Sequence, residues 1–255
     1  MKNVGLFGGC QLTYTYNFFL NNEVCSKNDF NIKFALSWFE YDKDYWEYKG
    51  TLDYNIFDNL DILIISNNPL SIDNQASNKR IINYVKNNNK NTIIIKTVSI
   101  RFSIFPINWN GYGENKNDYV NWTDLHKIDY KDKFKKCVNT VRKQINETHL
   151  HPFIADYIEE NFNKEYLFSH CMHPTNVLFY QIWKSLFICL KLNIEDYQYN
   201  FEEELVFNWL NPFTKKMMKD LNIQFDSYVD DDFYIKRYNE NKHLFFTNEE
   251  DDLYD

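Results

Sequence analysis

The sequence predicts an α/β fold, with a parallel sheet flanked by helices and a helical C-terminal part. Short apolar segments alternate with segments of helical periodicity over the first hundred residues. Each apolar segment is almost uniformly hydrophobic, which is typical of strands covered on both faces of a parallel sheet. After residue 130 mainly helical patterns follow, and no repeat or linker divides the chain. We therefore expect residues 1–255 to form a single domain, with a frayed acidic tail at about residues 248–255.

The expected elements follow one another in an order that suits right-handed βαβ crossovers. Strands are expected where apolar and β-branched residues gather, at residues 2–7, 32–39, 60–66 and 92–98. Helical spacing predicts helices at residues 11–20, 71–86, 131–146, 152–163, 174–192 and 213–221. Residues 101–130 are aromatic, rich in Asn and interrupted by Pro and Gly, so we expect a long loop over the sheet edge. Trp109 to Tyr112 are its candidate pocket-lining residues.

Composition and charge exclude several classes of function. The chain has 28 Lys and Arg against 36 Asp and Glu, and the net charge of -8 argues against nucleic-acid backbones and anionic membranes as partners. A hydrophobic content of 44% rules out disorder throughout. No apolar run is long enough to span a bilayer, and the first apolar run reaches Gly8 too soon for a signal peptide. The expected compartment is the cytoplasm, the host's for a viral protein, and a homo-oligomer is compatible with the sequence.

The cysteine pattern indicates neither disulfides nor zinc. The five cysteines are scattered, and none belongs to a Cys-x-x-Cys pair. His170 and His173 have no carboxylate at ligand spacing. We therefore expect no metal site.

The first candidate site is the segment Gly8-Gly9-Cys10-Gln11, where the first strand turns into the first helix. In an open α/β sheet, ligands bind at the carboxyl ends of the strands. A helix N-terminus lowers the pKa of a thiol and stabilises an oxyanion or a phosphate. The alternative is that Cys10 is a small buried residue at a turn.

The second candidate site precedes a long apolar helix, in the segment from Ser169 to Asn176. His173 could act there as a general base toward Cys10 or toward a substrate amine or hydroxyl. Thr175 and Asn176 could cap the helix or bind a ligand. The alternative is that His173-Pro174-Thr175 is only a helix start signal.

A third candidate site ends the third expected strand. The amide of Asn67 or Asn68 could donate into an oxyanion hole, although Asn-Asn-Pro is more often only a turn. Arg101 follows the fourth strand and could meet a phosphate or be a surface charge.

In combination, Gly8-Gly9-Cys10-Gln11 and the segment from Leu167 to Asn176 resemble the WcbI family of polysaccharide-biosynthesis proteins. That family's pattern has a first strand ending in Gly-Asn-Cys-Gln. Later, a Leu-Phe segment leads into a His-Pro-Thr/Ser-Asn helix start. The resemblance covers roughly residues 3–192, and Gly9 stands where the family usually has Asn.

The resemblance implies an SGNH-hydrolase-like, or Rossmann-like, α/β fold that binds coenzyme A and transfers an acetyl group to a sugar or nucleotide-sugar. Cys10 would take the position of the SGNH nucleophile and His173 that of its histidine. An SGNH histidine normally follows an Asp three residues earlier, where this chain has His170, so a Cys/His dyad or a histidine base alone is favoured. Together with the positions described above, we expect Gly8, Gly9, Cys10, Gln11 and Arg101 to bind the cofactor, and Asn67, Asn68, His170 and Asn176 to bind the substrate or the oxyanion.

Two mechanisms and two further functions stay open. Either His173 deprotonates the acceptor for direct attack on acetyl-CoA, which we favour, or Cys10 first forms a thioester. The alternatives to an acetyltransferase are an SGNH-type esterase or deacetylase of glycans, and a CoA- or glycan-binding protein without catalysis.

Overall fold

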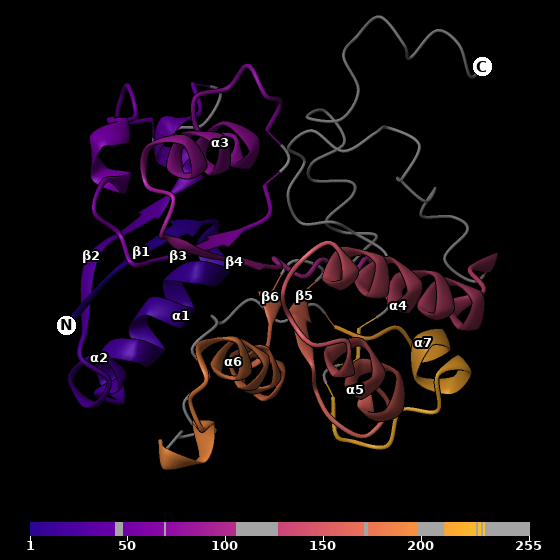
Figure 1. The fold of residues 1–255 in the computed structure, drawn as a ribbon. Coiled ribbons are helices and arrows are strands. Elements are labelled where there is room, and N and C mark those ends of the chain that lie inside the picture. The colour runs from indigo at the N-terminus through magenta and orange to yellow at the C-terminus, as the bar shows by residue number, and fades with distance from the viewer. Residues whose placement is uncertain are drawn as a thin grey trace, which may run out of the picture. The chain divides into compact units, whose positions relative to one another are not determined.

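The computed structural model describes residues 1–43, 48–68, 70–105, 127–170, 173–197, 212–227, 229–230 and 232. The chain divides into two compact units (Figure 1). The first unit comprises residues 1–99, 143–152 and 180–203, and the second comprises residues 100–142, 153–179 and 204–255. The expected loop residues Trp109 to Tyr112 and the expected acidic tail lie outside the described residues.

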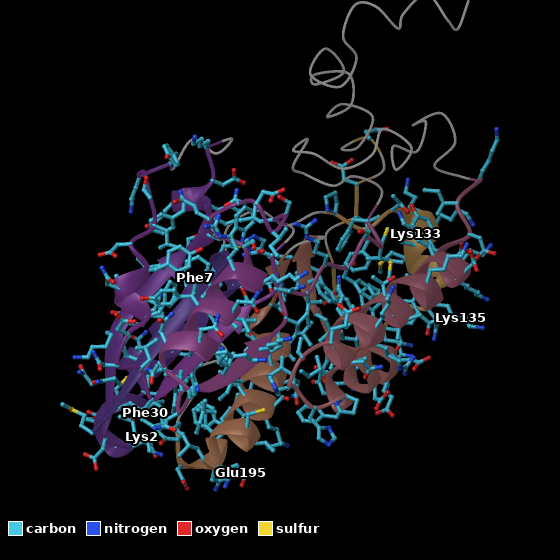
Figure 2. The ribbon with its side chains drawn as sticks, turned by 45° about the horizontal axis from the view of Figure 1, so that its top comes forward. Lys2, Phe7, Phe30, Lys133, Lys135 and Glu195 are labelled. Atoms are coloured by element: carbon cyan, nitrogen blue, oxygen red, sulfur yellow. The ribbon has the colours of Figure 1, made fainter. Side chains whose placement is uncertain are left out.

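The first unit contains a four-stranded sheet, which confirms the predicted α/β class. The strands run in the order β2-β1-β3-β4, and every neighbouring pair is parallel. Their bounds are β1 (Lys2–Gly8), β2 (Phe30–Ser37), β3 (Ile62–Ser66) and β4 (Ile93–Thr97). Lys2 pairs with Phe30 at the start of β1 and β2, and Phe7 lies toward the other end of β1 (Figure 2).

Strand β1 is central because its neighbours lie on opposite sides of it. The chain passes from β1 to β2 on one side and later returns to β3 on the other. In open α/β sheets, ligands usually bind outside the carboxyl ends of the two strands at which the order reverses, which here are β1 and β3. Helices α1 (Cys10–Asn21) and α3 (Asn78–Asn88) cover opposite faces of the sheet, and the short α2 (Val24–Lys27) follows α1 (Figure 1).

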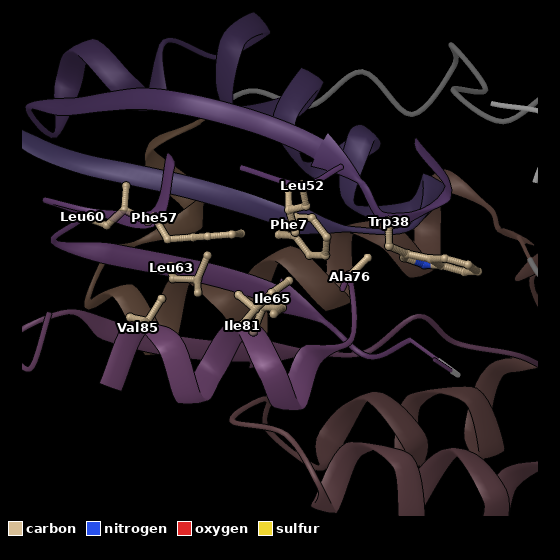
Figure 3. Packing of buried hydrophobic residues seen from close by; sticks show 10 residues of the cluster. All are labelled: Phe7, Trp38, Leu52, Phe57, Leu60, Leu63, Ile65, Ala76, Ile81 and Val85. Carbon is tan, nitrogen blue, oxygen red and sulfur yellow. The ribbon is translucent and has the colours of Figure 1, made fainter. Parts of the chain in front are cut away.

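The face under α3 is packed with apolar side chains. Ile81 and Val85, four residues apart on α3, point toward Leu63 and Ile65 of β3 (Figure 3). Trp38 lies at the opposite end of this cluster from Leu60, toward the carboxyl ends of the strands (Figure 3). The core therefore extends up to the edge where a ligand is expected.

The other face is closed by aromatic contacts of α1. Phe18 stacks on Trp183 of α6 (Asn176–Leu190) with 4.1 Å between ring centroids. The indole Nε1 of Trp183 donates to Thr15 Oγ1 at 3.1 Å. Trp183 is fully buried, so a residue late in the chain completes the core of the first unit.

The second unit is mainly helical, which agrees with the predicted helical C-terminal part. It contains α4 (Tyr130–Asn146) up to residue 142, α5 (Phe153–Asn161), the start of α6, and α7 (Lys215–Asp220), together with a short antiparallel pair of β5 (Phe168–His170) and β6 (His173–Pro174). Phe102 and Phe168 stack face to face with centroids 4.5 Å apart, and Phe162 packs beside both. None of the helices formed by described residues combines the length and apolar character needed to cross a bilayer.

One predicted helix was placed wrongly at its start. The helix expected over residues 71–86 begins only at Asn78, after turns over residues 72–76. Gln75 explains the delay, because its amide nitrogen donates to the carbonyls of Tyr41 and Gly50 and holds this segment against an earlier loop. Ser77 then caps α3 by accepting a hydrogen bond from the Arg80 N–H.

Candidate functional site

Small and polar residues collect where β1, β3 and β4 end in the first unit. We call this set the carboxyl edge; it consists of Gly8–Cys10, Ser66–Asn68 and Thr97–Ser99. The Gly9 N–H donates to Ser66 Oγ at 3.2 Å, and Ser99 Oγ donates to Ser66 Oγ at 3.4 Å. The Ser99 N–H donates to Asn67 Oδ1 at 2.5 Å. The ends of three strands are therefore tied together by side-chain hydrogen bonds.

Cys10 is the first residue of α1 and lies on this edge. Gly9 is the N-cap of α1, with extended backbone at φ -91° and ψ -170°, and it provides no side-chain cap. The positive end of the α1 dipole therefore faces the carboxyl edge. Cys10 is partly buried and forms no disulfide, while the neighbouring Gln11 is buried.

Tyr14 lies one helical turn after Cys10. Burial raises the pKa of the Tyr14 hydroxyl, and the negative charge of a Cys10 thiolate raises it further. Tyr14 is only 8% exposed and stays a neutral phenol at physiological pH. It cannot act as a phenolate base toward Cys10.

The two glycines of the edge allow close packing. A Cβ added at Gly8 would lie 2.2 Å from Ser66 Oγ and 2.9 Å from Leu12 Cδ2. A Cβ added at Gly9 would lie 3.3 Å from Trp38 Nε1. An Asn side chain at position 9 would therefore meet Trp38.

Gly8→Ala should destabilise the protein by about 1–3 kcal/mol, because the new methyl group overlaps a buried hydroxyl that is itself hydrogen-bonded. Urea unfolding followed by circular dichroism measures this loss. Gly50→Ala is the contrasting variant, since its added Cβ would meet nothing within 4 Å, although its φ of 117° adds backbone strain. A Gly8→Ala protein as stable as the wild type would contradict the packing described.

The two asparagines after β3 play different roles. Asn68 Nδ2 donates to the Ala76 carbonyl and to Asn78 Oδ1, both at 2.9 Å, and Asn78 Nδ2 donates to the Ser66 carbonyl at 2.7 Å. The Asn68 amide is therefore used to close the turn between β3 and α3. Asn67 uses its Oδ1 on Ser99, and its amide nitrogen has no hydrogen bond within the described residues. Of the two, Asn67 has the donor available for an oxyanion.

His173 belongs to the second unit, where it opens β6. Ser169 Oγ donates to the His173 carbonyl at 3.2 Å, and Thr175 Oγ1 donates to the Tyr166 carbonyl at 2.6 Å. Burial lowers the pKa of the His173 imidazole to about 4. The ring is therefore neutral at pH 7, and burial disfavours its protonation.

The predicted site residues divide between the two units. The first unit brings together on its carboxyl edge Gly8, Gly9, Cys10, Asn67 and Asn68, with Gln11 next in α1. The second unit holds Arg101, His170, His173 and Asn176. The backbones of His170 and His173 pair in the β5–β6 ladder, and Asn176 is buried at the start of α6. Within the described part of the chain, no three His, Cys, Asp or Glu side chains are grouped so that they could hold a metal ion.

Sequence reasoning missed Ser66, Ser99 and Trp38 as residues of this region. Ser66 had a detectable signal, since it is a lone hydroxyl at the end of the apolar run of β3. Ser99 and Trp38 had no such signal in the sequence. Ser99 contacts Ser66 and Asn67, and Trp38 lies beside Gly9, so both contacts join segments that are far apart along the chain.

Comparisons with known proteins bear on the fold. No family model matches the sequence, and no curated protein matches it. The structure is similar to that of WcbI, described as a polysaccharide biosynthesis enzyme and as the native protein without a disulfide bond between coenzyme A and one of its cysteines. The two chains are 13% identical, the match covers 80% of this chain and 74% of that one, and the TM-score is 0.53. This likeness shows that the protein shares the α/β fold of a polysaccharide biosynthesis enzyme.

Proposed function

We propose that the protein is a coenzyme A-dependent acyltransferase that acetylates an amine or hydroxyl of a sugar or nucleotide-sugar in glycan biosynthesis. The observation that carries the proposal is the position of Cys10, which is the first residue of α1 and lies on the carboxyl edge where the strand order reverses between β1 and β3. The description of WcbI refers to a disulfide bond between coenzyme A and one of its cysteines, although that structure lacks the bond, and this supports the same cofactor.

The residues of the carboxyl edge suit a bound thioester. Coenzyme A would supply an activated acyl group. The positive end of the α1 dipole and the Asn67 amide would stabilise the negative charge that develops on the acyl oxygen.

His173 is proposed as the general base. The resemblance of its motif implies this role: the imidazole would take the proton from the acceptor's O–H or N–H while the acceptor atom bonds to the acyl carbon. His173 would then return this proton to the thiolate that leaves when the carbon–sulfur bond is broken, so that the products would be the acetylated acceptor and coenzyme A thiol. Transfer through a Cys10 thioester is the competing route, and it divides the reaction into two steps.

Labelling with the disulfide form of coenzyme A tests whether the cofactor reaches Cys10. The Cys10 thiolate would attack one sulfur, form a mixed disulfide and release one molecule of coenzyme A thiol. Intact mass spectrometry should show one adduct on the wild type and on Cys25→Ala, and none on Cys10→Ala. Cys25 is a matched control because it is also partly buried and burial raises the pKa of its thiol. An adduct that persists on Cys10→Ala would contradict a cofactor site at this edge.

Acetyl transfer to a panel of sugars and UDP-sugars separates the two routes. With direct transfer, Cys10→Ala should keep its activity within about tenfold of the wild type, because the thiol forms no bond to the acyl group. Loss of all activity together with ping-pong kinetics in the wild type would assign the covalent route. The proposed function is rejected if Cys10 is not labelled and if, in addition, neither coenzyme A nor acetyl-CoA raises the melting temperature.

A further inference from the structure

A pocket of about 440 Å³ lies wholly within the first unit. Its walls come from α3, from the ends of β3 and β4, and from residues 144–148. The volume is within the range of about 300–1,000 Å³ that small-molecule sites occupy. The pocket meets the carboxyl edge at Asn67 and Thr97, which belong to both.

Three lysines give this pocket a positive charge. Lys79 and Lys86 are seven residues apart on α3 and so lie on one helix face, while Lys96 comes from β4. Within the described residues none of the three forms an ion pair. Glu147 is the one acidic residue among those that line the pocket, so three ammonium groups face one carboxylate. In a chain with a net charge of -8, such a local excess of positive charge is suited to an anion.

The remaining polar groups of the pocket suit hydroxyl groups rather than a second charge. The Gln144 Oε1 atom is buried and has no hydrogen-bond partner among the described residues. The Asn67 amide nitrogen and the exposed Asn83 side chain are likewise not used in hydrogen bonds there. An acceptor oxygen and amide donors at separate points around a cavity match the donors and acceptors of a sugar ring.

The apolar part of the lining argues against a nucleobase. Ile65 and Ile82 are the apolar side chains in the lining, and no described lining residue is aromatic. Bases are usually held by stacking on aromatic side chains or arginine. The three lysines could bind the phosphates of the 3′,5′-ADP part of coenzyme A. Its adenine, however, would have no aromatic side chain or arginine in the described lining to stack on.

We propose that this pocket binds a phosphorylated sugar, with Lys79, Lys86 and Lys96 on the phosphate and Gln144, Asn67 and Asn83 on the hydroxyls. Asn67 joins the pocket to the carboxyl edge, because it lines the pocket and also accepts from the Ser99 N–H. The proposal that a sugar phosphate binds here depends only on the residues that line the pocket. Only the identification of that sugar with the acyl acceptor rests on the proposed function.

Isothermal titration calorimetry of the full chain with glucose 1-phosphate tests the assignment. The wild type should bind it, with affinity that falls as salt is raised, and should bind glucose at least tenfold more weakly. The triple variant Lys79→Gln, Lys86→Gln, Lys96→Gln should bind glucose 1-phosphate at least tenfold more weakly than the wild type. A matched triple variant with the same change in charge, Lys33→Gln, Lys90→Gln, Lys184→Gln, should bind it within about twofold of the wild type. These three control lysines are exposed and do not line the pocket.

Three results would overturn the assignment. The first is no binding heat for the wild type at millimolar glucose 1-phosphate. The second is equal loss of affinity in both triple variants, which would indicate only non-specific attraction. The third is a wild type that binds 3′,5′-ADP through the three lysines but does not bind glucose 1-phosphate, which would give the pocket to the cofactor. The labelling of Cys10 by coenzyme A disulfide is a separate measurement that does not involve glucose 1-phosphate. It therefore distinguishes failure of the cofactor proposal from failure of the sugar-phosphate proposal.

Discussion

His173→Gln should lower kcat for acetyl transfer by at least about a hundredfold, because a positioned general base contributes roughly 10²–10⁴ to a rate. The pKa of about 4 sets the pH at which the wild type loses its base. Its kcat/KM should therefore stay level down to about pH 5 and fall only near pH 4. The rate of thiol release from acetyl-CoA, measured from pH 4 to 8, records both effects. A matched histidine variant, His151→Gln, changes an exposed imidazole and should keep kcat within about twofold of the wild type.

The low pKa of His173 also predicts how the stability of the protein changes with pH, which can be measured without an activity assay. In the unfolded chain the imidazole takes up a proton near its ordinary pKa of 6.5, whereas in the folded protein it does so only near 4. Between these values the unfolded state binds more protons, so stability is lost as the pH falls. Protonation of His173 should cost on the order of 3 kcal/mol over this window. Urea unfolding at pH 7 and pH 4.5 should show that loss in the wild type and a smaller one in His173→Gln. Equal losses in the two proteins would mean that the ring is not held neutral by burial.

Trp183→Ala should cost about 3–5 kcal/mol of unfolding free energy, the range found for truncating a fully buried large aromatic side chain. The indole is stacked on Phe18 with 4.1 Å between centroids, and its N–H is bonded to the buried hydroxyl of Thr15. Removing it opens a cavity between α1 and α6. Denaturant unfolding monitored by far-UV circular dichroism gives the free energy. A loss below about 1 kcal/mol would contradict the central position of this residue in the core.

Trp183→Phe separates packing from hydrogen bonding at the same position. Phenylalanine can keep the stack on Phe18 but leaves the Thr15 hydroxyl buried without its donor. The expected cost is about 1–3 kcal/mol, which is the penalty for an unsatisfied buried polar group. Thr15→Ser keeps the acceptor and should cost less than Trp183→Phe.

The strands and their order along the chain could be predicted because their burial is encoded locally. Residues 62–66 are buried without exception, and a uniform apolar run indicates a covered parallel strand whatever lies around it. The start of α3 could not be predicted in the same way. Its position depends on Gln75, whose hydrogen bonds reach the carbonyls of residues 41 and 50.

The candidate site was predictable only where it is continuous in sequence. The segment Gly8–Cys10 could be placed at a strand-to-helix junction from the order of its residues alone. The choice between Asn67 and Asn68 could not, because it depends on Asn78, ten residues later, which engages the Asn68 amide. The lysine-lined pocket was also invisible, since Lys79 and Lys86 come from a helix and Lys96 from a strand that separate turns bring together.

The contact between Thr15 and Trp183 spans 168 positions of the chain, and it affects the order in which the protein can be completed during synthesis. All four strands of the sheet lie within residues 2–97, and this part of the chain leaves the ribosome early. Until residue 183 has also emerged, the Phe18 side of α1 stays exposed to water, and apolar surface of that kind invites aggregation. A nascent chain stopped near residue 100 would therefore carry a formed sheet with one uncovered face, a species that molecular chaperones bind.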